Sequence, residues 1–509
     1  MTWWRLYGDA GRASAGTEAL PPFPVDWSRA ERLRVLGLCC AAVIVGVVVL
    51  LLTIDVPGDG PTHAIQAYEW SRHPYWARSG VWPPGFVYLA GICLLLIHNP
   101  LIEPRIFNLA LSTLAIPVFY ALVRRLYGPP AATIGTAMLV FLPLHVGLSV
   151  SSLTEPSFLF FTIAALLCLE RAVEGRKIQP LPFGRFLLFF SLAELTRYEV
   201  WPMIPLVLVY LYGRSRAVPA TAIAGATLMA FPIFWLAESY RDFGDPLFGF
   251  IQASIRPLEG GAAVSSATAI ANLARLARSH LGWLLSIGAI AGLAGEISRS
   301  IRGQMSSERT AYAVLVSIIW ALIFVAARSR GPALYDRNLL FGFVLALPVA
   351  TLPYLRVCDS YRHGILVAVL AGICSMAIAY VANRPRVFVT GRKPTEIVEL
   401  ARWLATTPYR NDAVLETKMD WDSTYLPLYA PQLSGRFLIV SLWVDDDALR
   451  RFIRDLQPSL LLTREEDAAY RHRVEHVLGH TISAQRRIYR EEHAEVYDLS
   501  DLMPPRADR

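Results

Sequence analysis

Ionisable residues stand where the first long apolar stretch of this sequence ends. Residues 55–63 read DVPGDGPTH and contain Asp55, Asp59 and His63. The two prolines and two glycines of this segment predict a turn rather than a helix. A carboxylate held on such a turn could take a proton from a hydroxyl group as a general base, and His63 could assist it. A solvated loop that ends the apolar stretch is the alternative.

Two further groups of ionisable residues lie beside apolar stretches. Glu155 precedes a proline in SSLTEPSF, and Arg197, Tyr198 and Glu199 separate two short apolar runs. Charged groups at membrane depth are costly and usually face a cavity or a partner. Arg197 could bind a phosphate, because a guanidinium stays charged and contacts phosphate oxygens in pairs. The alternatives are a helix N-terminus for Glu155 and an internal Arg197–Glu199 ion pair.

Several other polar positions have a weaker claim. Arg337 opens a late apolar run, and Asp245 lies in FGDPLF, where a turn explains it equally well. His472, His476 and His480 are spaced four apart and could share a helix face that binds zinc. A solvated helix face explains them more simply, and Asp445–Asp447 reads as the acidic start of a helix rather than a metal cluster.

The elements that must position these residues are membrane-spanning helices. Of the 509 residues, 54% are hydrophobic and 17% are charged, whereas soluble domains carry about 25% charged residues. The sequence therefore predicts a polytopic α-helical membrane protein. Eleven apolar runs are candidate spans, at 35–54, 101–123, 131–148, 156–173, 183–196, 200–213, 217–237, 281–297, 311–327, 338–355 and 363–382.

The segment 84–98 decides the orientation of the chain. It has 15 apolar residues after two prolines, which suits a helix lying on the membrane better than a span. If it does not span, the basic clusters between the later runs fall on the side of the N-terminus, as the positive-inside rule demands. The sequence then predicts a cytoplasmic N-terminus and places 55–83, 149–155, 196–199, 238–280, 328–337 and the C-terminal region outside.

The chain divides by composition into three parts. A polar segment, 1–34, without the pattern of a cleavable signal peptide precedes a transmembrane domain, 35–382. The charged region 383–509 alternates helical and strand patterns and is predicted to be an extracytoplasmic α/β domain. None of the six cysteines falls in that region, so no disulfide framework is expected.

The order of the motifs resembles a known superfamily. GDGPTH, WPP, ALVRRLYG, LPLH, SSLTEPSF and LTRYEVWP follow one another over roughly 30–355. This series is similar to the GT-C integral-membrane glycosyltransferases that use polyprenyl-phosphate sugars, such as protein O-mannosyltransferases and aminoarabinose transferases. The resemblance implies transfer of a sugar from a lipid phosphate to an acceptor hydroxyl, with inversion, on the outer face of the membrane.

The resemblance also implies roles for individual residues. Asp59 matches the first-loop acid and is expected to be the base, Glu155 a second acid, and Arg197 and Arg337 the phosphate ligands. The family commonly has Asp-Glu where this chain has Asp59-Gly60, so a divalent metal held by an acidic pair loses support, although Asp55 could substitute. Tyr198, Glu199, His63 and Asp245 are further site candidates.

Two other functions compete with sugar transfer. A transporter or flippase of lipid-linked glycans would place ionisable residues mid-span and show inverted repeats; here they gather at span ends and no repeat is visible. A membrane-anchored binding protein would act through 383–509. The expected partners are the bilayer, a polyprenyl-phosphate sugar and a glycan, lipid or protein acceptor, and no nucleic acid. The sequence names neither sugar nor acceptor.

Overall fold

The computed structural model groups the chain into two compact units, which are described separately. The first comprises Met1–Thr53, Tyr75–Tyr88 and Arg105–Val389, and the second Ile54–Pro74, Leu89–Pro104 and Thr390–Arg509. The structure describes residues 27–53, 59–77, 80–174, 176–249, 264–330, 336–356, 361–387, 395–408, 413–416, 426–427, 429–430, 433, 437–439, 446–464, 468–491 and 494–503.

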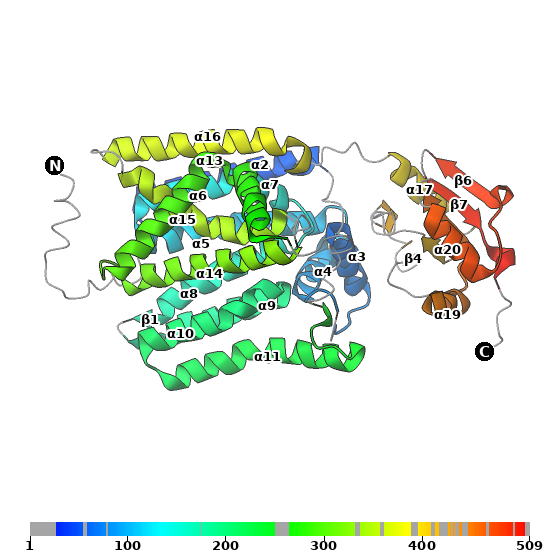
Figure 1. Ribbon diagram of the computed structural model, residues 1–509, viewed down its shortest axis with the longest axis horizontal. Helices are drawn as coiled ribbons and strands as arrows, with labels where there is room; N and C mark the ends of the chain where they lie inside the picture. The colour runs from blue at the N-terminus through cyan, green and yellow to red at the C-terminus, as the bar shows by residue number, and fades with distance from the viewer. Residues whose placement is uncertain are drawn as a thin grey trace. The chain divides into compact units, whose positions relative to one another are not determined.

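The first unit is a bundle of long apolar helices that lie side by side (Figure 1). Its helices are α2 (Arg29–Leu52), α5 (Glu103–Tyr127), α6 (Pro129–Phe141), α7 (Pro143–Ser149), α8 (Glu155–Ala172), α9 (Pro180–Thr196), α10 (Ile204–Ser215), α11 (Val218–Phe243), α13 (Ser266–Ile301), α14 (Ser307–Arg330), α15 (Leu340–Arg356) and α16 (Tyr361–Val387). Short elements join them: strands β1 (Val173–Glu174) and β2 (Lys177–Ile178), and 3-10 helices η1 (Tyr198–Met203) and η4 (Asp336–Leu339). Helix α4 (Gly85–Ile97) crosses the boundary between the units.

All eleven predicted apolar runs coincide with helices. Within the described residues six helices are long and apolar enough to cross a membrane, or seven if α6 and α7, bent by 59°, form one broken span. The protein is therefore an integral membrane protein, while the number of eleven spans stays a prediction. The disputed segment 84–98 is α4, a short apolar helix. Its 13 residues are fewer than the ~20 that a spanning helix needs.

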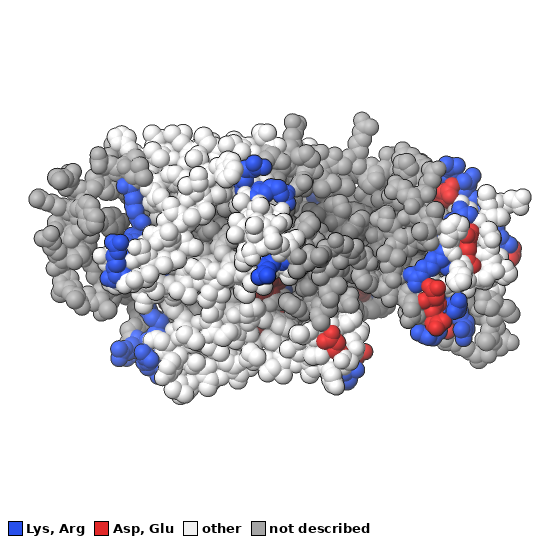
Figure 2. Space-filling model, viewed as in Figure 1, with Lys and Arg blue, Asp and Glu red and all other residues white. Residues whose placement is uncertain are grey.

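Ion pairs tie the helices together at one end of the first unit. Figure 2 shows Lys and Arg side chains gathered at the end of the first unit where α10 and β1 lie in Figure 1. Four carboxylates of the described residues there meet an arginine of another helix: Glu31 with Arg124, Glu170 with Arg125, Glu308 with Arg214, and Glu296 with Arg356. Pairing lowers the cost of keeping these carboxylates among apolar helices. The opposite helix ends carry the candidate site.

The second unit contains a mixed five-stranded sheet of order β4-β3-β5-β7-β6. Strands β3 (Val414–Glu416), β4 (Phe437–Ile439) and β5 (Leu460–Arg464) are parallel, and β6 (Arg487–Glu491) and β7 (Ala494–Asp498) complete it antiparallel. The unit also holds α3 (Asp59–Arg72), α17 (Thr395–Thr406), α19 (Asp446–Leu456), α20 (Ala468–Leu478), η7 (Ala484–Arg486) and η8 (Ser500–Leu502). Helices α17 and α19 and strands β4, β5 and β7 fall in the region where the sequence alternates helical and strand patterns.

Alternate residues of the strands face two separate cores. Leu460 and Leu462 of β5 pack with Leu400 and Leu404 of α17, while Leu461 packs with α19 and α20. This follows from the two-residue period of a strand whose faces are both covered by helices. Ala64 of α3 belongs to the first of these cores, so a helix from the early part of the chain is built into the sheet unit.

The turn predicted at 55–63 is wrong for its second half. Asp59 begins α3, and His63 is a buried helical residue, not a loop histidine. Pro61 fits because it is the third residue of the helix, where its missing N–H has no helical partner to lose. Asp55 lies outside the described residues.

Candidate functional site

Glu155 is the first residue of α8, and its side chain is almost fully buried, with 4% exposed. The preceding segment is fixed by two polar residues of α5. Arg105 Nε donates to the Val150 carbonyl over 2.6 Å, and Asn108 Nδ2 donates to the carbonyls of Ser151 and Leu153, each over 2.7 Å. These bonds satisfy backbone groups that would otherwise be buried unpaired. They also set where α8, and therefore Glu155, begins.

Arg197 reaches Glu155 from the end of α9. Its Nη1 lies 2.6 Å from Glu155 Oε1 and 3.1 Å from the Thr154 hydroxyl. Helix α9 ends at Thr196 and η1 begins at Tyr198, and Arg197 lies between them with extended backbone dihedral angles. This break turns its side chain across to α8. Glu155 and Arg197 therefore lie in direct contact, while their roles as second acid and phosphate ligand stay predictions.

Arg337 approaches the same carboxylate from η4. Its Nε lies 3.5 Å from Glu155 Oε1. Two guanidinium groups from distant parts of the chain therefore meet at one buried carboxylate. A site with two arginines can hold an anion with paired hydrogen bonds.

Glu199 and Tyr198 complete this cluster in different ways. Arg197 Nε donates to Glu199 Oε1 over 2.9 Å, so the internal pair considered from the sequence is present as well. Tyr198 accepts a hydrogen bond from Trp235 Nε1 at 3.0 Å and donates to the Val81 carbonyl at 3.1 Å. Tyr198 thus ties η1 to α11, and its position next to Arg197 is structural rather than directed at Glu155.

The other sequence candidates lie apart from these contacts. Asp59 and His63 are on α3 of the second unit, which is described by itself, so their place beside Arg197 stays a prediction. Asp245 accepts a hydrogen bond from the Leu247 N–H at 2.8 Å and forms the expected turn after α11.

The candidate metal residues of the C-terminal region have other partners. His472 pairs with Glu475 at 3.0 Å with 80% of its side chain exposed. Asp446 lies 2.8 Å from Arg473, whose hydrogen bond holds the pKa of Asp446 below its usual range. Asp445 lies outside the described residues, and within them no three His, Cys, Asp or Glu residues gather as a metal site.

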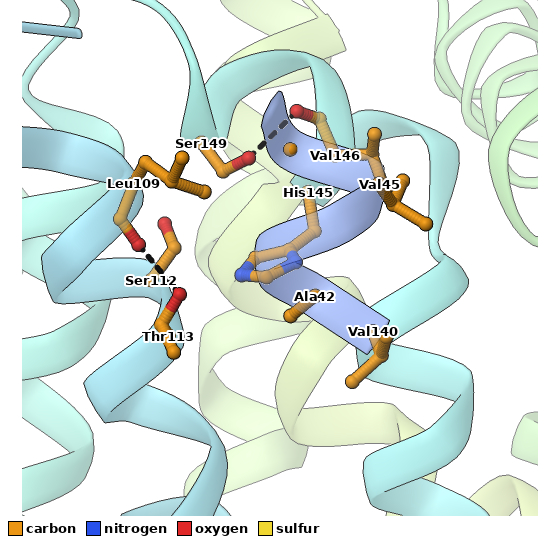
Figure 3. A pocket seen from close by; sticks show the side chains of 10 residues that line it. Ala42, Val45, Leu109, Ser112, Thr113, Val140, His145, Val146 and Ser149 are labelled. Carbon is orange, nitrogen blue, oxygen red and sulfur yellow. Dashed lines mark hydrogen bonds between the residues drawn. The ribbon is translucent and has the colours of Figure 1, made fainter. Parts of the chain in front are cut away.

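One small cavity lies between α2, α5 and α7 (Figure 3). His145 of α7 points into it, beside Ser112 and Ser149, and its volume is about 10 Å³. That is room for about one water molecule. The cavity is too small for a sugar and holds no charged residue, so it is not the candidate site.

Sequence reasoning missed the residues that position the site. Arg105, Asn108, Thr154 and Trp235 all contact it or the segment that carries Glu155. Arg105 and Asn108 offered a signal, because both stand inside a run otherwise predicted to span, where polar side chains need partners. Thr154 and Trp235 offered none that separates them from ordinary residues of their segments.

The comparisons with known proteins point to one superfamily. Residues 81–237 match the family described as dolichyl-phosphate-mannose-protein mannosyltransferase, and among curated proteins none matches. The fold is similar to ArnT from Cupriavidus metallidurans bound to undecaprenyl phosphate, with a TM-score of 0.63 and 13% identity, covering 92% of this chain and 99% of ArnT.

A second similar structure is the oligosaccharyltransferase AglB from Archaeoglobus fulgidus, in complex with an inhibitory peptide and a dolichol-phosphate. Its TM-score is 0.58 at 12% identity, covering 88% of this chain and 71% of AglB. The resemblance predicted from the motifs is therefore confirmed: the chain has the fold of the GT-C membrane glycosyltransferases and carries, over residues 81–237, the sequence pattern of the dolichyl-phosphate-mannose-protein mannosyltransferase family.

Proposed function

We propose that the protein transfers a sugar from a polyprenyl-phosphate donor to an acceptor hydroxyl on the extracytoplasmic face of the membrane, with inversion. The observation that carries this proposal is the meeting of Arg197 and Arg337 at the buried Glu155. It occurs in a fold shared with ArnT, which has been seen with undecaprenyl phosphate.

The proposed chemistry needs a base and an anion site. Asp59 takes the proton of the acceptor hydroxyl as its oxygen attacks the anomeric carbon from the face opposite the phosphate. The bond between that carbon and the phosphate oxygen breaks, and its electrons stay on the departing polyprenyl phosphate. Arg197 and Arg337 stabilise the added negative charge.

Glu155 has two parts in this proposal. Its contacts with both arginines suit it to hold them in position, since a buried carboxylate restricts the guanidinium groups that it pairs with. Its role as a second acid facing Asp59 stays part of the proposal. No metal is assigned to the reaction, and the classes of sugar and acceptor are left open.

The distribution of charge supports the proposed orientation. The arginine-rich end of the first unit would face the cytoplasm with the N-terminus, because cytoplasmic loops carry the excess of basic residues. The end with Glu155, Arg197 and Arg337 would then face outward, and 383–509 would be an extracytoplasmic α/β domain. A cytoplasmic donor is excluded in this arrangement.

The direct test is incubation of the purified protein with a panel of polyprenyl-phosphate sugars and an assay for release of polyprenyl phosphate. Asp59→Asn should reduce turnover by about 10²-fold or more, since an amide cannot accept the proton. Arg197→Ala should weaken apparent donor affinity. Full turnover of Asp59→Asn would remove it as the base, and an unchanged donor affinity of Arg197→Ala would remove the phosphate ligand.

A further inference from the structure

The guanidinium group of Arg197 contacts two carboxylates along different edges. Nη1 faces Glu155 and the Thr154 hydroxyl, at 2.6 and 3.1 Å. The Nε–Nη2 edge faces Glu199: Nε donates to Glu199 Oε1 over 2.9 Å, and Nη2 contacts the same oxygen. Two parallel N–H groups are the arrangement with which arginine binds a phosphate. The edge of Arg197 best suited to phosphate is therefore occupied by a carboxylate of the same chain.

The two carboxylates differ in how readily they can move. Glu155 is the first residue of α8 and its side chain is 4% exposed, whereas the side chain of Glu199 is 42% exposed. Ion pairs open to solvent contribute little stability, on the order of 1 kcal/mol or less, while separating a buried pair costs much more. An incoming anion would thus displace Glu199 and leave Glu155 in place.

We propose that Glu199 is an internal counter-anion, which occupies the phosphate-binding edge of Arg197 and leaves it when the lipid phosphate binds. This inference rests on the proposed function. Arg197 and Arg337 carry two positive charges, and Glu155 and Glu199 carry two negative charges. A phosphodiester donor has one negative charge, so its exchange for Glu199 leaves the net charge around the two arginines unchanged.

The exchange also affects the product. When the sugar departs, the phosphate becomes a monoester with a charge of about −1.5 to −2 at neutral pH. While this product phosphate is bound to the Nε–Nη2 edge of Arg197, Glu199 cannot pair with that edge. Glu199 therefore competes with the product phosphate for Arg197. Glu199 therefore weakens product retention and makes room for the next donor.

The test is binding of undecaprenyl phosphate to the purified full-length protein in detergent. Glu199→Gln keeps the shape of the side chain but removes its charge, and a neutral amide competes less well for a guanidinium. We expect the dissociation constant to fall by about fivefold, the scale of an exposed ion pair. Glu199→Ala should change it in the same direction and serves as the second variant.

A matched control is available in the same unit. Glu238 lies 2.7 Å from Arg241 on α11, and Glu238→Gln removes a carboxylate from an arginine without touching Arg197. Its affinity for undecaprenyl phosphate should equal that of the unaltered protein. Size-exclusion profiles of all variants establish that each is folded before binding is compared.

The outcomes separate this inference from the function on which it rests. Weaker or unchanged binding in both Glu199 variants would overturn the counter-anion, since it would mean that Glu199 positions Arg197 or does nothing there. If the unaltered protein itself fails to bind undecaprenyl phosphate, or Arg197→Ala binds it equally well, the phosphate site of the proposed function fails instead.

Discussion

At the scale of single residues, Glu155 is the centre of the candidate site. Its carboxylate is buried and meets Arg197 Nη1 at 2.6 Å and Arg337 Nε at 3.5 Å. The Arg197 and Arg337 side chains are 17% and 20% exposed, so water screens these contacts only in part. Removing the charge of Glu155 would leave two neighbouring cations that repel each other.

Glu155→Gln should accordingly destabilise the protein and weaken donor binding together. Loss of a charge partner at a largely buried pair should lower the free energy of unfolding by about 1–3 kcal/mol. A thermal unfolding scan in detergent measures it. Glu238→Gln is the control that should shift less, because its arginine partner, Arg241, is 53% exposed and pairs with it over a single helical turn. Equal melting temperatures for the two variants would contradict the central role of Glu155.

At the scale of elements, Gly282 shapes the long helix α13. It has φ 73° and ψ 167° inside the helix, a conformation open essentially to glycine alone. A Cβ there would lie 2.8 Å from the Ser375 Cα and carbonyl oxygen of α16. The kink therefore depends both on backbone freedom and on the close approach of α16.

Gly282→Ala should lower stability by at least the ~1–3 kcal/mol of a forced backbone conformation. Gly295→Ala in the same helix is the matched control, because the nearest atom to its Cβ would be 3.8 Å away and its backbone is regular. Alanine at that site should be neutral or stabilising. Thermal scans of both variants decide the matter, and equal effects would refute the special role of Gly282.

The sequence predicted the helices better than it predicted the site. Apolar runs of spanning length show where helices lie, because a backbone in lipid must pair all of its N–H and C=O groups internally and a helix does so. Asp59 was misplaced on a turn, since Pro61 reads as a helix breaker until its place in the first turn is known. The pairing of Arg197 with Glu155 depends on how α8 and α9 pack, and local sequence carries no signal of that partner.

At the scale of the whole molecule, charge asymmetry gives the first unit a direction. Helix α11 begins after Arg216 at the arginine-rich end and ends at Phe243. Lys177 of β2, in the connection between α8 and α9, and Asp242, at the end of α11, are both exposed and lie toward opposite ends of the helices. The positive-inside rule therefore predicts that they face opposite sides of the membrane.

Single cysteines at these positions test the orientation. In a background without native cysteines, Asp242→Cys should react with a membrane-impermeant maleimide on intact cells, and Lys177→Cys should react only after permeabilisation. Both single-cysteine variants must keep the activity of the unaltered protein, so that the labelling reports the topology of a folded protein. The reverse labelling pattern would invert the proposed topology and place the arginine site in the cytoplasm.

The position of Ala64 among Leu400, Leu404 and Leu462 has a practical consequence for deletion experiments on this protein. A fragment that begins after α3 would lack the helix that covers these leucines, so its fold would be destabilised. A lack of acceptor binding by such a fragment would therefore not show whether residues 383–509 recognise an acceptor. Helices α19 and α20 pack against the opposite side of the sheet. Substitutions of their exposed residues leave the contact between Ala64 and the leucines intact and therefore give a more direct test of acceptor recognition.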